Sequence, residues 1–241
     1  AVGAANPRKK IAFFSLEMSA EAVTQRLLCT QSRIPLTSIL DGSFNKADIG
    51  RLTTAVNILR DAQIFIDPTG GLTIYELRAK ARKLMDSEKI DLIVIDYLQL
   101  MRAPEVGRES RQVEVAAISG GLKKLAKDLN VPVLVLAQLN RETEKGAPAG
   151  KNVKPKLTNL RESGSIEQDA DVVVFLHRER DDSKESNREA NRSGVKSSLI
   201  VEKNRNGKTG ELDLLFFPSL MEFRSVDHKI DAEDVPIQAK I

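Results

Sequence analysis

The fold of this chain is decided by residues 91–100, which read Asp-Leu-Ile-Val-Ile-Asp-Tyr-Leu-Gln-Leu. An apolar run leads directly to Asp96, at the point where a buried strand would end. In open α/β sheets ligands bind beyond the carboxyl ends of the strands, so a carboxylate there can face a ligand while its strand stays buried. Because an acid in this position is also a common cap or turn residue, the interpretation needs support from elsewhere in the chain.

Two further apolar runs end in a polar side chain. Residues 11–17 end at Glu17, and residues 131–138 end at Gln138. If all three runs form parallel strands, Glu17, Asp96 and Gln138 meet along one edge of the sheet. One carboxylate can anchor the shell of Mg²⁺, a second can orient an attacking water, and an amide can sense a terminal phosphate. The pattern therefore predicts nucleotide hydrolysis, with Asp96 as the magnesium ligand.

Longer amphipathic segments alternate with the apolar runs, which is typical of βαβ units and predicts an α/β fold with a mostly parallel, twisted sheet flanked by helices. Ser19, Asn45 and Thr73 are placed to cap the starts of three helices. A long helix is expected to end near Leu129, and Gly120-Gly121 within it predicts a kink or a close helix contact. Asn206-Gly207 predicts a hairpin between two strands near the C-terminus.

Composition places limits on the class of protein. The 241 residues are 41% hydrophobic, which fits a single α/β domain ending in a polar tail over residues 225–241. A net charge of +3 does not by itself require a polyanionic partner. Cys29 is the single cysteine and is expected to be a buried thiol, which suits a reducing cytoplasm. With no signal-peptide core and no apolar run of about 20 residues, we expect a soluble protein with no membrane partner.

Five segments in a fixed order carry a family resemblance. They are residues 14–19 (FSLEMS), 95–100 (IDYLQL), 137–139 (AQL), 161–171 (RESGSIEQDAD) and 203–207 (KNRNG). With them the chain resembles the C-terminal, RecA-like ATPase domain of replicative DNA helicases of the DnaB family, from Lys10 to about Phe223. The resemblance implies a RecA-like fold with a C-terminal antiparallel hairpin. It also implies an ATP-driven motor that moves 5′→3′ along single-stranded DNA and unwinds duplex DNA during replication.

The same resemblance implies roles for the polar residues at the strand ends and in the hairpin. Glu17 would be the catalytic base, Asp96 the Walker B ligand of Mg²⁺, and Gln138 the sensor of the terminal phosphate of ATP. Lys203 and Arg205 would reach into the nucleotide site of the neighbouring subunit in a homo-hexamer. Their period-two spacing puts them on one face of a strand, which agrees with that assignment.

Arg161, Glu162 and Gly164 would lie on a loop that lines the central channel and grips single-stranded DNA. Between residues 141 and 162 there are six Lys or Arg and three Glu, so this segment is locally basic. Contacts to phosphates without stacking aromatic residues predict binding that is tolerant of DNA sequence and sensitive to salt. A primase and a helicase loader are expected partners, in the bacterial cytoplasm at replication forks on the nucleoid.

One family motif is absent from the sequence. The phosphate-binding loop G-x-x-x-x-G-K-[ST] does not occur, because Gly207-Lys208-Thr209 has Glu202 five residues before its glycine and precedes a predicted strand. We therefore expect the chain to be truncated before Ala1, without the first strand, the phosphate loop, the first helix and the N-terminal collar domain. Such a chain would expose backbone and apolar faces and would bind nucleotide weakly or not at all.

Two other interpretations remain open at this point. A recombination or repair ATPase related to the RadA family shares acids at the ends of its strands, although residues 161–171 argue against it. A non-catalytic module that forms a ring or binds a loader would explain the missing phosphate loop.

Overall fold

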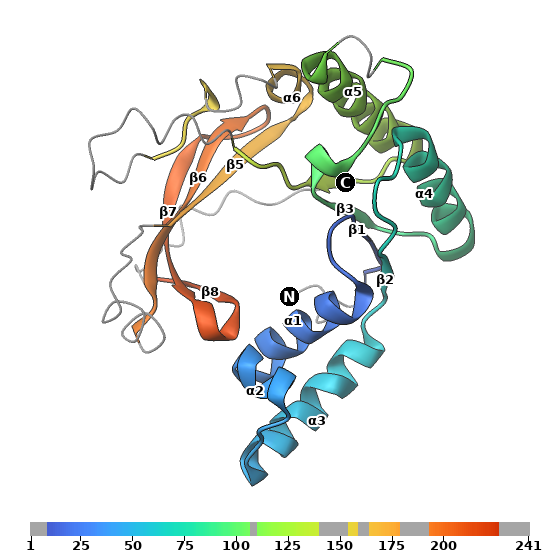
Figure 1. The fold of residues 1–241 in the computed structure, drawn as a ribbon. Coiled ribbons are helices and arrows are strands. Elements are labelled where there is room, and N and C mark those ends of the chain that lie inside the picture. Colours follow the sequence, from blue (N-terminus) through green and yellow to red (C-terminus); the bar gives the residue numbers. More distant parts are fainter. Residues whose placement is uncertain (1–8, 107–109, 140–153, 159–163, 179–192, 227–241) are drawn as a thin grey trace.

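The computed structural model describes residues 9–106, 110–139, 154–158, 164–178 and 193–226, which form two four-stranded sheets, with most of the helices on the side of the first sheet (Figure 1). The first sheet is parallel throughout, as the alternation of apolar runs and amphipathic segments predicted. Its strands lie in the order β2-β1-β3-β4, with bounds Ile64–Asp67, Ile11–Ser15, Leu92–Asp96 and Val133–Val135.

The second sheet is antiparallel and larger than the predicted hairpin. Its strands follow the chain order β5-β6-β7-β8, with bounds Val172–Arg178, Val195–Asn204, Gly210–Phe217 and Glu222–Ser225. The predicted hairpin is the pair β6 and β7. Strand β8 was not predicted, because its four residues contain two charged side chains and become a strand only by pairing with β7.

The helices begin where the capping residues predicted. Ser19 Oγ accepts a hydrogen bond from the Ala22 amide at 3.2 Å, and Asn45 and Thr73 each form a reciprocal capping box. Helix α2 was not predicted, because its start at Pro35 has no side-chain cap. The helices are α1 Ala20–Ser32, α2 Leu36–Asp41, α3 Lys46–Asp61, α4 Ile74–Glu88, α5 Arg111–Leu129 and α6 Gly164–Asp169, with short 3₁₀ turns η2 Leu98–Leu100 and η5 Pro218–Leu220.

The main core lies between the parallel sheet and helices α4 and α5. Ala12 and Phe14 of β1 pair in register with Ile93 and Ile95 of β3, so these four side chains share one face of the sheet. All four are completely buried. They pack in one cluster with Leu77 and Ala81 of α4 and Val115, Ile118, Leu122 and Leu125 of α5. This packing holds the carboxyl ends of β1 and β3 in a fixed relation.

Gly121 lies where helix α5 meets the start of α4. A Cβ atom at this position would stand 2.5 Å from Cγ1 of Ile74, which is a buried side chain. The helix stays continuous from Arg111 to Leu129, so the close contact predicted for this pair of glycines occurs and the helix is not interrupted. Gly120 is different, because a Cβ atom there would meet no heavy atom within 4 Å.

These two neighbouring glycines predict opposite effects of the same substitution. Gly121→Ala is expected to lower the free energy of unfolding by about 1–3 kcal/mol, because the buried Ile74 side chain must move. Gly120→Ala is expected to raise it by about 0.5–1 kcal/mol, because alanine loses less backbone entropy in a helix. Urea denaturation of both variants measures the difference, and equal effects would show that the close contact carries no energy.

Strands β4 and β5 are edge strands with exposed apolar side chains. The strand predicted before Gln138 is confirmed as β4, parallel to β3, but it is shorter than its apolar run and less buried: it has three residues, and Leu134 and Leu136 are 55% and 43% exposed. On β5 the residues of one face, Val172, Val174 and Leu176, are about half exposed. Each of these edges lacks a neighbouring strand within the described residues. Unpaired edges with exposed apolar side chains are surfaces on which a further strand could pair.

The hairpin predicted around Asn206-Gly207 is confirmed as the pair β6 and β7, but without the positive φ expected of these two residues. Neither Asn206 nor Gly207 has a positive φ, and five residues separate the two strands. The Asn204 side chain organises the turn, accepting from the Asn206 amide at 3.3 Å and donating to the Lys208 carbonyl at 3.3 Å. A side-chain amide thus replaces the backbone geometry that Asn-Gly usually provides.

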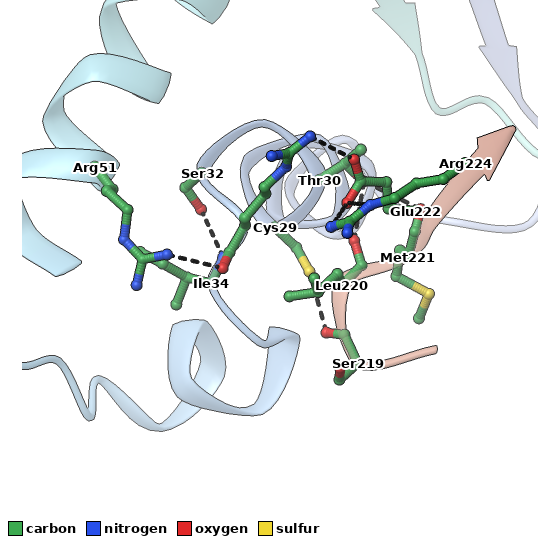
Figure 2. A network of polar contacts seen from close by, with 11 residues as sticks. Cys29, Thr30, Ser32, Ile34, Arg51, Ser219, Leu220, Met221, Glu222 and Arg224 are labelled. Atoms are coloured by element: carbon green, nitrogen blue, oxygen red, sulfur yellow. Dashed lines mark hydrogen bonds and ion pairs between the residues drawn. The ribbon is translucent and has the colours of Figure 1, made fainter. Parts of the chain in front are cut away.

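Helix α1 is tied to the turn between β7 and β8 (Figure 2). Cys29 Sγ donates to the Ser219 carbonyl at 3.5 Å, and Thr30 Oγ1 donates to the Met221 carbonyl at 3.3 Å. Arg33 forms an ion pair with Glu222 at 3.1 Å. Cys29 is completely buried, as predicted, and burial raises the pKa of its thiol. These contacts join the first helix to the last strands of the chain.

Among the helices that the structure describes, none combines the length and the apolar character needed to cross a membrane.

Candidate nucleotide site

The carboxyl ends of β1, β3 and β4 lie side by side at one edge of the parallel sheet. Ser15 pairs with Asp96, and the Leu16 amide donates to the Asp96 carbonyl at 2.8 Å. On the other side of β3, the Leu136 amide donates to the Ile95 carbonyl at 2.9 Å. Glu17 and Gln138 follow these last paired positions. The three polar residues predicted to meet are therefore brought to the same edge of the sheet.

The turn after β1 presents Glu17 to solvent. Ser15 is buried, and its Oγ donates to the Met18 carbonyl at 2.8 Å, which folds the chain back over two residues. Leu16 is buried beneath the turn, while Glu17 is exposed. The next residue after Met18 is Ser19, which caps helix α1. The turn is therefore fixed by the Ser15 hydrogen bond at one end and by the start of the helix at the other.

Asp96 has a raised pKa at this edge. Burial and then the neighbouring negative charge of Glu17 raise the pKa of Asp96, while the positive charge of Arg26 on α1 acts in the opposite direction. Two carboxylates that repel each other provide the oxygen ligands that Mg²⁺ prefers. The described residues contain no group of three or more His, Cys, Asp or Glu placed to hold a metal ion, so water and phosphate would have to complete its coordination.

Gln138 lies at the exposed end of the segment that follows β4. Its backbone carbonyl accepts a hydrogen bond from Gln99 Nε2 at 2.9 Å, and its backbone amide donates one to Gln99 Oε1 at 3.1 Å. The intervening segment from Asp96 turns through a cis peptide bond before Tyr97 and then through η2. Gln99 thus connects the segments that follow β3 and β4.

Lys203 and Arg205 both reach the C-terminal end of helix α6. Lys203 Nζ donates to the Glu167 carbonyl, and the Arg205 guanidinium donates to the Gln168 carbonyl at 2.6 Å. Cations are favourable at a helix C-terminus, where the backbone carbonyls lack partners. The two basic side chains therefore act together on one helix end, which agrees with their predicted common face.

Asp171 anchors Arg205 further. Its carboxylate pairs with the guanidinium of Arg205 at 2.9 Å and also with Nζ of Lys123 on α5. The hydrogen bond from Lys123 lowers the pKa of Asp171, as does the charge of Arg205. The Arg205 side chain still remains 46% exposed. A guanidinium has five N–H donors, so Arg205 keeps donors that can face an incoming anion.

The predicted DNA-binding residues are only partly within the described chain. Arg161 and Glu162 lie outside the described residues. Gly164 was predicted to lie on a loop, and this prediction was wrong, because Gly164 is the first residue of helix α6. Ala170, which follows the helix, packs against the core of the antiparallel sheet, and this packing favours a helical turn over an extended loop.

Two residues that the sequence analysis did not single out belong to this edge. Gln99 was only part of the matching segment 95–100, and its position three residues after Asp96 was the one available signal. Arg26 lies two turns into α1, and nothing in the sequence places it beside Asp96. The effect of Arg26 on Asp96 depends on where the folded chain places α1, which packs against α2 and α3.

Comparison with known proteins identifies the family. The model of the DnaB-like helicase C-terminal domain matches residues 1–225. The chain belongs to the DnaB-like helicase C-terminal domain family. Replicative DNA helicase DnaB of Geobacillus stearothermophilus is 38% identical over 97% of this chain, and replicative DNA helicase DnaC of Bacillus subtilis is 38% identical over 95% of it. Family membership settles the choice between a DnaB-family and a RadA-related domain.

Two solved structures share the fold. One of them, described as an ATPase domain, has a TM-score of 0.78 and 29% identity over 92% of this chain and 76% of its own. A DnaB-like replicative helicase, described with its interactions with primase, has the same score and identity over 92% of this chain and 52% of its own. The present chain spans about half the length of the curated relatives, 49% and 48% of the two named above.

Proposed function

We propose that this chain is the motor domain of an ATP-dependent replicative DNA helicase, in which hydrolysis drives movement along single-stranded DNA and unwinding of the duplex. One observation carries the proposal: Glu17, Asp96 and Gln138 follow three adjacent parallel strands at the same edge of the sheet. This arrangement supports nucleotide chemistry because ligands of α/β sheets bind at the carboxyl ends of the strands.

The residues at this edge would have different roles in ATP hydrolysis. Asp96 would hold Mg²⁺ through its carboxylate, and Glu17, which is more exposed, would accept the proton of the attacking water. Gln138 would contact the terminal phosphate of ATP through its side-chain amide. When bound, Mg²⁺ supplies positive charge that neutralises phosphate oxygens. Burial, and then the charge of Glu17, raise the pKa of Asp96, and a bound cation would offset both effects, which supports this division.

Lys203 and Arg205 would act on the nucleotide of the neighbouring subunit in a homo-hexamer. Stabilising the charge of a transferring phosphoryl group requires a cation that is held in place. Asp171 and the carbonyls of α6 hold these side chains in the single chain, and the guanidinium of Arg205 stays partly exposed. The same helix begins at Gly164, two residues after Glu162, which with Arg161 is a proposed DNA-binding residue.

Partners and location follow from the family. A relative in this family is described with its interactions with primase, and we extend that partner, together with a helicase loader, to this protein. The site of action would be the replication fork in the bacterial cytoplasm. The phosphate-binding loop would come from a part of the protein outside the 241 residues.

The test is ATP hydrolysis with and without single-stranded DNA. We expect the longest product of the gene to hydrolyse ATP faster when single-stranded DNA is added and to unwind a forked duplex. Residues 1–241 alone are expected to show no measurable turnover, because they contain no phosphate-binding loop. A full gene product that neither hydrolyses ATP nor binds single-stranded DNA would overturn the proposal and favour the non-catalytic ring module.

A further inference from the structure

The side chain of Gln99 bonds to the backbone of Gln138 as a peptide group would. Gln99 Nε2 donates to the Gln138 carbonyl at 2.9 Å, and the Gln138 amide donates to Gln99 Oε1 at 3.1 Å. A primary amide has the donor and the acceptor of a peptide unit. The pair of bonds therefore imitates one step of a strand ladder and restrains both polar groups of the Gln138 backbone.

The position of this pair explains why a side chain is needed. The last backbone bonds between the two segments are Leu136 amide to Ile95 carbonyl and Leu98 amide to Leu136 carbonyl, both at 2.9 Å. Beyond them the chain turns away through η2, so its backbone no longer runs beside the segment that carries Gln138. Gln99 extends the connection between the two segments by the two residues that separate Leu136 from Gln138.

Gln99 is itself held by the start of helix α5. The guanidinium of Arg111 donates to the Gln99 carbonyl at 2.7 Å and also pairs with Glu114. Glu114 in turn accepts from the Ala103 amide at 3.0 Å, which ties down the segment after η2. The contacts run from Ala103 through Glu114, Arg111 and Gln99 to the backbone of Gln138. The backbone of Gln99 is therefore restrained, and this fixes the point from which its side-chain amide extends.

We propose that Gln99 is a positioning residue for Gln138. By holding the Gln138 backbone at the open edge of the sheet, it sets the point from which the Gln138 side chain reaches the terminal phosphate. The inference rests on the proposed function, in which Gln138 contacts that phosphate. Positioning matters there because a displacement of about 1 Å at a reacting group can cost on the order of 100-fold in rate.

Gln99→Glu gives a test that a purely structural role would not pass. Ionised, the new carboxylate still accepts from the Gln138 amide but cannot donate to the Gln138 carbonyl, which it repels. Protonated, it regains a donor. In the full gene product we expect kcat to fall about tenfold or more relative to wild type near pH 8. The ratio of variant to wild-type kcat is expected to rise again only as pH falls below about 5, toward the ordinary pKa of a glutamate carboxyl. Gln99→Leu is expected to show a loss of similar size with no recovery.

The matched control is Gln112→Glu. Gln112 is exposed in the first turn of α5, beside Arg111, so the substitution makes the same chemical change close to the network without touching Gln138. We expect its kcat to equal that of wild type at every pH. Gln138→Ala, measured in parallel, shows whether turnover depends on the Gln138 side chain.

Amide hydrogen exchange tests the contact separately from activity. In residues 1–241, Gln99→Leu is expected to speed exchange at the Gln138 amide, while the Leu136 amide, bonded to Ile95, stays protected. Unchanged exchange at Gln138 would overturn the inference. The inference would also be overturned if Gln99→Glu matched Gln112→Glu at every pH while Gln138→Ala abolished turnover. That outcome would leave the proposed function standing. A wild-type gene product without ATPase activity overturns the proposed function, and the inference falls with it.

Discussion

An Arg205→Ala form of the full gene product is expected to bind ATP nearly as well as wild type and to hydrolyse it about 10³-fold more slowly. Arginines that stabilise a transferring phosphoryl group in other NTPases contribute about 10³ to 10⁵ in kcat. Arg205 is partly exposed and held by Asp171 and Gln168, so its charge is in place before a neighbouring subunit arrives. Fluorescent nucleotide binding and steady-state turnover separate the two quantities.

Action between subunits predicts rescue when two inactive variants are mixed. Arg205→Ala subunits keep Glu17 but lack the cation, and Glu17→Gln subunits keep the cation but lack the base. At an interface where the first provides the nucleotide site and the second provides Arg205, both groups are present. We expect mixed rings to regain turnover, and a mixture as inactive as its components would argue that Arg205 acts within its own subunit.

Two controls separate chemistry from folding. Lys208→Ala removes a positive charge from the same exposed turn and is expected to leave turnover unchanged. Arg205 also caps helix α6, so the unfolding temperature of Arg205→Ala must be measured. Loss of a cap costs about 0.3–1 kcal/mol, which is too little to unfold the domain at room temperature. A large fall in stability would show that the lost turnover has a structural cause.

Glu17→Gln is expected to abolish most ATP turnover and to stabilise the fold near neutral pH. A general base contributes about 10²- to 10⁴-fold to a rate, so a loss in that range is expected. The gain in stability has a separate cause. Burial and the charge of Glu17 raise the pKa of Asp96 in the folded state, and Glu17→Gln removes the second of these causes. A residue whose replacement stabilises the fold while removing activity is one kept for function.

The pH dependence follows from the direction of the pKa shift. Since the folded-state pKa of Asp96 lies above its unfolded value, the folded state binds more protons between the two values, and stability falls as pH rises through that window. Glu17→Gln reduces this loss. Its unfolding temperature is therefore expected to exceed that of wild type near pH 7 and to match it at pH values well below the ordinary pKa of an aspartate carboxyl, about 3.9, where Asp96 is protonated in both the folded and the unfolded state.

Glu21→Gln is the matched control for that stability measurement. Glu21 lies in the first turn of α1, where backbone and Ser19 hydrogen bonds lower its pKa. Its charge therefore stabilises the fold above its ordinary pKa, and Glu21→Gln is expected to lower the unfolding temperature near pH 7 while leaving turnover unchanged. If the two substitutions shift the unfolding temperature in the same direction, the repulsion between Glu17 and Asp96 is not the cause.

Features governed by local chemistry were predictable from the sequence. Ser19, Asn45 and Thr73 cap their helices because a short polar side chain satisfies backbone amides within the same turn. The apolar runs before Glu17 and Asp96 form strands because their side chains are buried on the sheet. The order of these runs, separated by helices, also predicted their parallel arrangement.

The points on which the structure departs from the predictions share a physical cause, which is that burial and pairing depend on neighbours. The apolar residues 131–138 contain an exposed edge strand of three residues, because apolar character alone does not provide a second neighbouring strand. Gly164 opens a helix whose following residue packs on the second sheet. The Asn206-Gly207 turn takes its shape from Asn204, since a side-chain hydrogen bond there competes with the usual tight turn.

The sequence by itself determined the parallel sheet, the helix starts and the placement of Glu17, Asp96 and Gln138 at strand ends, because each follows from the period of apolar residues and from contacts within a few residues. Only the tertiary structure decided that Arg26 lies near Asp96, that Gln99 holds the backbone of Gln138, and that Lys203 and Arg205 share one end of helix α6. These contacts join residues about 35 to 70 positions apart in the chain. Such distances close only when the core has packed, because the packed core offsets the entropy of closing the intervening loops.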